Sequence, residues 1–170
     1  MKKLMIVLIS IILLFGCTQQ TTAKTTENKL IEQDQKMENK VSGSTEYQGE
    51  KIAGSTTPYI RYNDADFDKA RESGKAIYLY FYANWCPICT QERPNIFTAF
   101  NEMKNENAIG FEVHFNDDKT TDEDRNKARE LGVSYQHTTI ILDKKGAVFF
   151  RSLTPIDTEE IKLKIKEAAR

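Results

Sequence analysis

The sequence predicts an α/β domain with a central mixed β-sheet and helices on both faces of that sheet. Segments patterned as strands and as helices alternate along residues 59–170, and the last two strand segments follow each other directly. Residues 76–82 form a continuous apolar and aromatic run, which is typical of a strand covered on both faces. Hydrophobic residues make up 39% and charged residues 29% of the 170 residues, a balance that suits a globular domain with a core.

Each expected element has its own local signal. We expect a short edge strand at 59–62, and Asn63 or Asp64 should cap the helix that follows it. Pro94 lies inside the longest helix and should kink it, because proline lacks the N–H that would bond to the preceding turn. Residues 143–146 form the turn of a hairpin. The expected strands are 59–62, 76–82, 109–115, 138–142 and 147–151, and the expected helices are 64–73, 87–104, 122–131 and 157–169.

The N-terminus has the pattern of a targeting segment. Lys2 and Lys3 precede an apolar stretch, 4–15, that is shorter than the ~20 residues of a membrane span and fits the core of a secretory signal peptide. The stretch ends in Leu-Phe-Gly-Cys at 14–17, which resembles the lipobox of bacterial lipoproteins. The resemblance implies cleavage before Cys17 and attachment of lipid to it. An ordinary signal peptide, or a short anchor helix with an incidental Cys17, is the alternative.

These patterns divide the chain into three parts. Residues 1–16 are expected to be the lipoprotein signal peptide, 17–57 the lipidated cysteine with a flexible polar tether, and 58–170 the folded domain. The tether has too few apolar residues to offset the entropy lost on ordering. We therefore expect a lipid-anchored protein on the outer side of a bacterial cytoplasmic membrane. The formal net charge of −1 gives no reason to expect nucleic acid as a partner.

A pair of cysteines carries the chemistry that the sequence suggests. Cys86 and Cys89 are separated by two residues and stand between the buried strand 76–82 and a helix. Cys86 is the expected nucleophile, because the N–H groups and dipole of a helix N-terminus favour a thiolate and lower the thiol pKa below its free value of ~8.5. Cys89, one helical turn further in and less exposed, is the expected resolving thiol. A purely structural disulfide, or half of a metal site, is the alternative for this pair.

These motifs resemble the thioredoxin family, and more closely its membrane-tethered extracytoplasmic members. The resemblance covers about 64–170 and rests on the approach 81–86, the Cys-Pro-Ile-Cys motif 86–89, Pro94 five residues after the second cysteine, and the segment 132–143. It implies a thioredoxin-like fold and a thiol:disulfide oxidoreductase, with reductase favoured over oxidase. It also implies protein disulfide or dithiol substrates and a membrane or extracytoplasmic electron donor. We expect no cofactor and a monomer.

The residues beside the cysteines should tune the reaction. Trp85 should shield the disulfide and offer a flat apolar contact to a partner chain, unless it is a plain packing aromatic. Pro87 supplies no N–H to the Cys86 thiolate, and Ile88 adds no side-chain donor. The identity of these two central residues should influence the reduction potential.

Two positions depart from the pattern of the family. His137 stands where thioredoxins usually have a cis-proline, so its preceding bond should be trans and its side chain should lie close to both sulfurs. Tyr80 stands where thioredoxins carry a buried carboxylate beneath the second cysteine. A phenol, with a pKa of ~10, is a poor base at neutral pH, so deprotonation of Cys89 needs another route. Tyr80 is expected in or near the core, and contact of its hydroxyl with Cys89 stays open.

His137 leaves the function open to more than one interpretation. In one interpretation His137 is functional, as a proton acceptor for Cys89 or as a cation that stabilises the Cys86 thiolate. In the other it is a loop substitution that only replaced proline. Two thiolates and one imidazole are also a plausible Zn or Cu site, which would make the protein a metallochaperone, although our leading interpretation assigns no metal. A redox-inert adaptor that binds partners through Trp85 is a further alternative, and it predicts that Cys86→Ser leaves function intact.

Two further groups of polar residues receive no functional role from the sequence. His114 is expected to be a solvated strand residue. Residues 117–125 are expected to form a solvated, charged loop that enters a helix, since the spacing of the carboxylates does not match a calcium loop.

Overall fold

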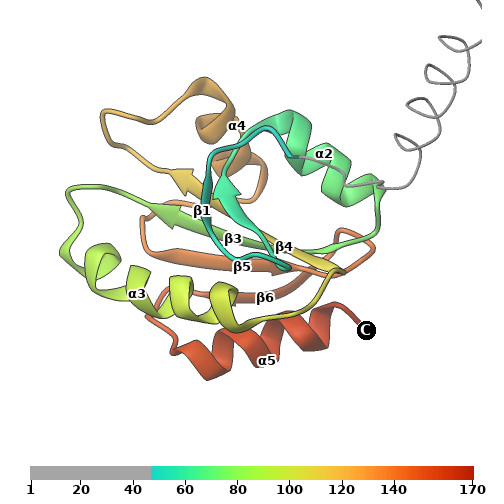
Figure 1. Cartoon of the computed structure of the whole chain (residues 1–170). Helices are drawn as coiled ribbons and strands as arrows, with labels where there is room; N and C mark the ends of the chain where they lie inside the picture. Colours follow the sequence, from blue (N-terminus) through green and yellow to red (C-terminus); the bar gives the residue numbers. More distant parts are fainter. Residues whose placement is uncertain (1–46) are drawn as a thin grey trace, which may run out of the picture. The chain divides into compact units, whose positions relative to one another are not determined.

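The computed structural model describes residues 47–170, so the predicted signal peptide, Cys17 and most of the tether lie outside the described residues. A six-stranded mixed sheet, with strand order β1-β2-β4-β3-β5-β6, forms the centre of this part (Figure 1). Within residues 47–170, the helices are too short or too polar for any of them to span a bilayer.

The strands and helices follow the order that the sequence predicts, with one strand added at the start. The central strands β2, β4 and β3 are parallel to one another, whereas β1, β5 and β6 are each antiparallel to their neighbours. The strands are β1 (Lys51–Ala53), β2 (Tyr59–Arg61), β3 (Ala76–Tyr82), β4 (Ala108–His114), β5 (Thr138–Leu142) and β6 (Val148–Ser152). The helices are α2 (Asp64–Glu72), α3 (Pro87–Glu102), α4 (Asp122–Glu130) and α5 (Thr158–Ala168).

Helices cover both faces of the sheet, and β3 contributes to both cores. Helices α3 and α5 lie on one face and α2 and α4 on the other (Figure 1). Tyr78 and Tyr80 of β3 pack on the side of α3 and α5, whereas Ile77, Leu79 and Phe81 pack on the opposite side. Every residue of β3 is buried, which explains why its sequence is continuously apolar instead of alternating.

Side-chain caps define where the helices begin. Asn63 caps α2 by accepting a hydrogen bond from the backbone N–H of Asp66 at 2.8 Å, as the sequence suggested. Thr121 caps α4 in a capping box, in which its side chain and that of Asp124 bond reciprocally to each other's backbone N–H. These local signals explain why the predicted helix starts agree closely with the structure.

The sheet extends further toward the N-terminus than the expected domain start at Pro58. Strand β1 pairs with β2, so β2 is an internal strand and not the edge strand that the sequence suggested. Two long-range contacts hold this segment: Gly49 N–H donates to Asp66 at 2.7 Å, and Gly54 N–H donates to Asn101 at 2.9 Å. A three-residue strand without an apolar pattern has no local signal, because its stability comes from these distant partners.

Candidate active site

The cysteine pair lies where β3 ends and α3 begins. Cys86 is the N-cap residue of α3, and its sulfur accepts a hydrogen bond from the backbone N–H of Cys89 at 3.2 Å. Pro87 follows in the first helical position, where the absence of an N–H costs nothing. Both cysteines are free thiols. The sulfur of Cys86 therefore faces the positive end of the helix dipole.

Burial of the two thiols differs less than the sequence suggested. Cys86 is 2% exposed and Cys89 is 0% exposed, so neither presents a wide open surface. The neighbouring residues Trp85 and Ile88 are 55% and 42% exposed, and Tyr135, two positions before His137, is 63% exposed. We name these three apolar side chains the apolar rim and expect a partner that reaches Cys86 to contact them.

His137 lies beside the two sulfurs, at the position where the sequence predicted it. The potential metal-ligating atoms of Cys86, Cys89 and His137 all lie within 4.8 Å of one another. The backbone of His137 is in the left-handed region, with a φ of 51°, which is uncommon for a residue other than glycine. Its Nδ1 atom is buried and has no hydrogen-bond partner.

A buried carboxylate lies close to Cys89, and it comes from α3 instead of β3. The hydroxyl of Tyr80 donates a hydrogen bond to Glu92 Oε2 at 2.8 Å, and the backbone N–H of Ile156 donates to Glu92 Oε1 at 3.2 Å. Glu92 is 2% exposed. The same hydroxyl lies close enough to Cys89 to influence the pKa of its thiol. Tyr80 thus lies between the second cysteine and a buried carboxylate.

The surroundings of Cys89, Tyr80 and Glu92 shift the pKa values of these three side chains. The pKa of Cys89 is raised to about 11, chiefly by burial and then by the hydrogen bond with Cys86, although the Ala83 backbone and the nearby Tyr80 act to lower it. Burial also raises the pKa of Glu92, against the opposing effects of the bonds from Tyr80 and Ile156. The pKa of Tyr80 is raised by burial and by the neighbouring Glu92 carboxylate. At neutral pH the Tyr80 phenol and the Cys89 thiol are therefore both protonated.

Glu92 is a site residue that was not expected from the sequence, although the sequence contains a signal for it. Glu92 follows Cys89 by three residues and precedes Ile96 by four, so all three lie on one face of α3. That face is buried, and Glu92 is its charged member. A lone carboxylate in the apolar stripe of a helix is costly to bury, and such a residue next to a redox cysteine is a candidate for proton transfer.

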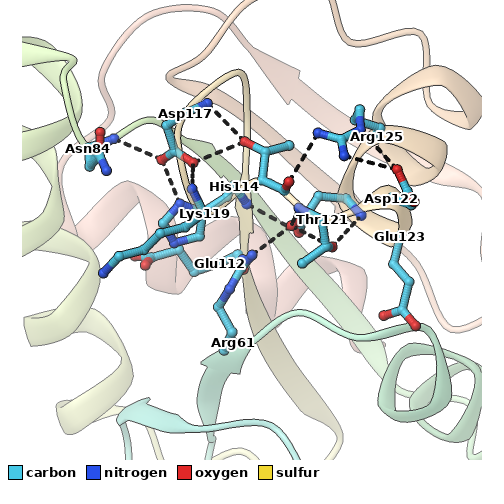
Figure 2. A network of polar contacts seen from close by, with 12 residues as sticks. Arg61, Asn84, Glu112, His114, Asp117, Lys119, Thr121, Asp122, Glu123 and Arg125 are labelled. Atoms are coloured by element: carbon cyan, nitrogen blue, oxygen red, sulfur yellow. Dashed lines mark hydrogen bonds and ion pairs between the residues drawn. The ribbon is translucent and has the colours of Figure 1, made fainter.

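His114 is part of a buried polar network and is not the solvated strand residue that the sequence predicted. Its Nδ1 atom lies 2.6 Å from Asp117 Oδ2, and its ring packs edge-on against Tyr82. Asp117 Oδ2 also accepts the backbone N–H of Asn84 at 3.0 Å. Figure 2 shows this carboxylate between His114 and Asn84, which ties the loop after β4 to the loop that carries the cysteines.

Most residues of the charged segment 117–125 are exposed, as the sequence suggested, but two of its carboxylates are buried. The side chains of Asp117 and Asp124 are 0% exposed, whereas Asp122 is open to solvent. Asp124 pairs with Arg61 at 2.6 Å and completes the cap of α4. The adjoining Asn116 carbonyl accepts the indole N–H of Trp85 at 2.9 Å. Residues 116 and 117 therefore hold the loop that carries the cysteines through hydrogen bonds to Asn84 and Trp85.

Removing the Asp117 carboxylate should loosen the cysteine loop. Asp117→Ala deprives Asn84 N–H and His114 of their acceptor, so we expect a loss of about 2–3 kcal/mol in the free energy of unfolding. Burial opposes ionisation of Asp117, but the bonds from His114, Asn84 and Thr120 together lower its pKa. The stabilisation should therefore be complete at neutral pH and should decline as the pH falls below about 4 toward the lowered folded-state pKa of Asp117. Urea unfolding of both proteins at pH 7 and pH 3 measures the difference.

Asp122→Ala is the matched control for this change, because Asp122 is an exposed carboxylate of the same segment. It should alter the free energy of unfolding by no more than about 0.5 kcal/mol. An equal effect of the two substitutions would contradict the role that we assign to Asp117.

Comparison with known proteins agrees with this architecture. A profile of the AhpC/TSA family matches residues 49–151. Thioredoxin H4 of Arabidopsis thaliana is 35% identical over 98 residues, which is 58% of this chain and 75% of the plant protein.

Solved structures share the fold. Trxlp from Edwardsiella tarda superposes with a TM-score of 0.54 and 24% identity, over 63% of this chain and 97% of that chain. A thioredoxin from Aeropyrum pernix superposes with a TM-score of 0.52 and 16% identity, over 74% of this chain and 98% of that chain. The thioredoxin-like fold that the sequence predicted is therefore confirmed. Since the family profile spans most of the described residues and the plant relative is similar across most of its own length, the chain belongs to the AhpC/TSA family of thioredoxin-like proteins and is a homologue of thioredoxins.

Proposed function

We propose that the protein is a membrane-anchored, extracytoplasmic thiol:disulfide oxidoreductase that exchanges disulfides with protein substrates. The observation that carries this proposal is the buried Tyr80–Glu92 hydrogen bond next to Cys89, beneath a free cysteine pair at a helix N-terminus. A purely structural cysteine pair gains nothing from a buried carboxylate, which costs free energy wherever it is placed in a core. A resolving thiol gains a place to deliver its proton.

Cys86 begins the reaction. Its sulfur lies at the N-terminus of α3, where it accepts the Cys89 N–H and faces the positive end of the helix dipole. The thiolate attacks one sulfur of a substrate disulfide, forms a mixed disulfide and releases the other substrate sulfur as a thiolate. The rim formed by Trp85, Ile88 and Tyr135 provides apolar contacts for the polypeptide on either side of that disulfide.

Cys89 completes the reaction through Tyr80 and Glu92. In the resting state the Tyr80 hydroxyl donates to Glu92, so its oxygen is free to accept the Cys89 proton. When that proton moves to Tyr80, the phenol proton passes to Glu92, and the result is a Cys89 thiolate beside a neutral acid. The thiolate attacks the Cys86 sulfur, breaks the mixed disulfide and releases the second substrate thiolate. Two electrons have then passed from the protein dithiol to the substrate.

Formation of the mixed disulfide itself prepares Cys89. After burial, the next cause that raises the pKa of Cys89 is its hydrogen bond with Cys86, and the charge of Cys86 adds to it. Both effects end when the Cys86 sulfur is bonded to substrate. The pKa of Cys89 should therefore fall below about 11 at the stage when its thiolate is needed.

The location and direction of the reaction come from the sequence. The apolar segment 4–15 and the Leu-Phe-Gly-Cys motif support export and a lipid anchor on Cys17, which would place the dithiol outside the cytoplasmic membrane. We propose reduction of substrate disulfides as the direction, with electrons supplied by a membrane or extracytoplasmic donor to a monomeric protein.

Trapping tests the proposal directly. In Cys89→Ala the mixed disulfide forms on Cys86 but cannot be resolved, so substrate proteins should stay covalently attached until a reductant releases them. Affinity purification under non-reducing conditions, followed by mass spectrometry, identifies them. The double variant Cys86→Ser with Cys89→Ala is the control and should retain none. Failure to recover any adduct under several redox conditions would rule out protein disulfides as the substrates.

A further inference from the structure

The reduced site brings together three donor atoms that suit a thiophilic metal ion. Cys86, Cys89 and His137 each offer one ligand atom, and these atoms lie within 4.8 Å of one another. A tetrahedral zinc site has Zn–S distances of about 2.3 Å and Zn–N distances of about 2.0–2.1 Å, which sets the ligand atoms roughly 3.5–4 Å apart. We propose that the reduced protein binds one Zn²⁺ ion through the sulfurs of Cys86 and Cys89 and the ring of His137.

His137 provides an observation independent of the cysteine spacing. Its Nδ1 atom is buried without a hydrogen-bond partner, which is unfavourable for a ring nitrogen unless another group uses it. Its backbone is held in the left-handed region, at a φ of 51°, a conformation that a side chain of this size rarely adopts. A metal ion bound at Nδ1 and shared with the two sulfurs would give this nitrogen the partner that the protein does not provide.

The charges of the surroundings favour zinc over copper(I). Two thiolates carry a charge of −2, which Zn²⁺ neutralises and Cu⁺ does not. The site is buried and lies within electrostatic range of the Glu92 carboxylate, so a remaining negative charge would be costly. Three protein ligands also leave the fourth tetrahedral position to a water molecule, an arrangement that zinc accepts with a two-cysteine, one-histidine set.

Zinc binding and disulfide formation exclude each other. Binding forms two Zn–S bonds and displaces any proton that the two sulfurs still carry, whereas oxidation of the pair joins the same two sulfurs in an S–S bond. Zinc would therefore hold the dithiol reduced and block exchange with substrates. This consequence rests on the proposed function, but the binding itself does not. At a free zinc concentration of 100 times the dissociation constant, the equilibrium between the dithiol and disulfide forms shifts about a hundredfold toward the dithiol. This shift raises the midpoint potential by about 59 mV.

Titration of the full chain tests the binding without any activity assay. The reduced, metal-free protein is titrated anaerobically with Zn²⁺ in competition with a chromophoric chelator. We expect one zinc ion per reduced chain and none on the disulfide form. His137→Asn should weaken binding at least tenfold, and asparagine is suitable because it tolerates the left-handed backbone. Cys86→Ser should abolish binding, and Tyr135→Phe, an exposed residue of the same loop, should not change it.

Cobalt(II) gives a second readout of the same ligands. The reduced protein should show the visible bands of tetrahedral, thiolate-bound Co²⁺, and His137→Asn should change them. Three results would overturn the inference: equal zinc binding by the oxidised form, unchanged affinity in His137→Asn, or tight binding of Cu⁺ without binding of Zn²⁺. The protein could also bind zinc as expected and yet fail to exchange disulfides when it is free of metal. That result would refute the proposed function without affecting the inference about the metal site.

Discussion

Cys86→Ser should lower the rate of disulfide exchange by at least about a thousandfold, the largest effect that we expect from any single change. A serine hydroxyl does not ionise at physiological pH, so the substitution removes the nucleophile and not merely its activation. The measurement is reduction of a protein disulfide, such as those of insulin, by the reduced protein under single-turnover conditions. The redox-inert adaptor that binds through Trp85 predicts no change in function.

The fold should tolerate this substitution, which makes the result clear to interpret. Cys86 is the N-cap of α3, and serine is among the preferred residues for that position because its oxygen accepts the same backbone N–H. We expect the free energy of unfolding of Cys86→Ser to equal that of the reduced parent or to exceed it slightly. Loss of activity together with loss of stability would point to a structural role for Cys86 instead.

Glu92→Gln should slow resolution of the mixed disulfide by about 10²-fold while leaving its formation unchanged. The amide cannot accept the proton that Tyr80 relays from Cys89, so only solvent base can remove it. In the parent, resolution should accelerate as the pH rises through the elevated pKa of Glu92 and then level off. In Glu92→Gln the rate of resolution should continue to rise with pH, because the Cys89 thiol must lose its proton to solvent. Rapid-quench kinetics with a disulfide peptide, across a range of pH, separates the two profiles.

Tyr80→Phe is the matched test of the relay. It preserves the buried ring and removes the hydroxyl that joins Glu92 to Cys89. If the proton travels through the phenol, Tyr80→Phe and Glu92→Gln should slow resolution to a similar extent, and the double variant should be no slower than either. Resolution at the parent rate in Glu92→Gln would exclude the carboxylate from the proton pathway.

The stability of Glu92→Gln should show that the carboxylate serves chemistry and not folding. Because burial raises the folded-state pKa of Glu92, the parent loses stability as the pH rises from about 4.3, the unfolded value, through the folded value. Above that window the folded state holds a costly buried charge that glutamine lacks. We expect Glu92→Gln to be as stable as the parent or more stable at pH 8, by up to about 2 kcal/mol, even though one hydrogen bond is weakened.

The sequence predicted those parts of the fold that depend on local patterns. The continuous apolar run at 76–82 identified the buried strand, and cap residues such as Asn63 placed the helix starts, because a cap acts within three residues of itself. The Cys-Pro-Ile-Cys spacing located the dithiol, and the resemblance to thioredoxins placed His137 beside it. Short-range spacing, periodicity and a family pattern were enough for these conclusions.

The remaining features depend on contacts between distant segments. The burial of His114 and Asp117 follows from the way the loop after β4 folds against Asn84, more than 30 positions away. The role of Glu92 follows from its contact with Tyr80, which lies on a different element. Thioredoxins carry the buried carboxylate on the strand, at the position of Tyr80, whereas here α3 supplies it. The sequence alone determined which side chains carry the sulfur chemistry. Only the tertiary structure decided which charged groups are buried around the cysteine pair. The free energy of a buried charge depends on its partners, and no local sequence pattern specifies them.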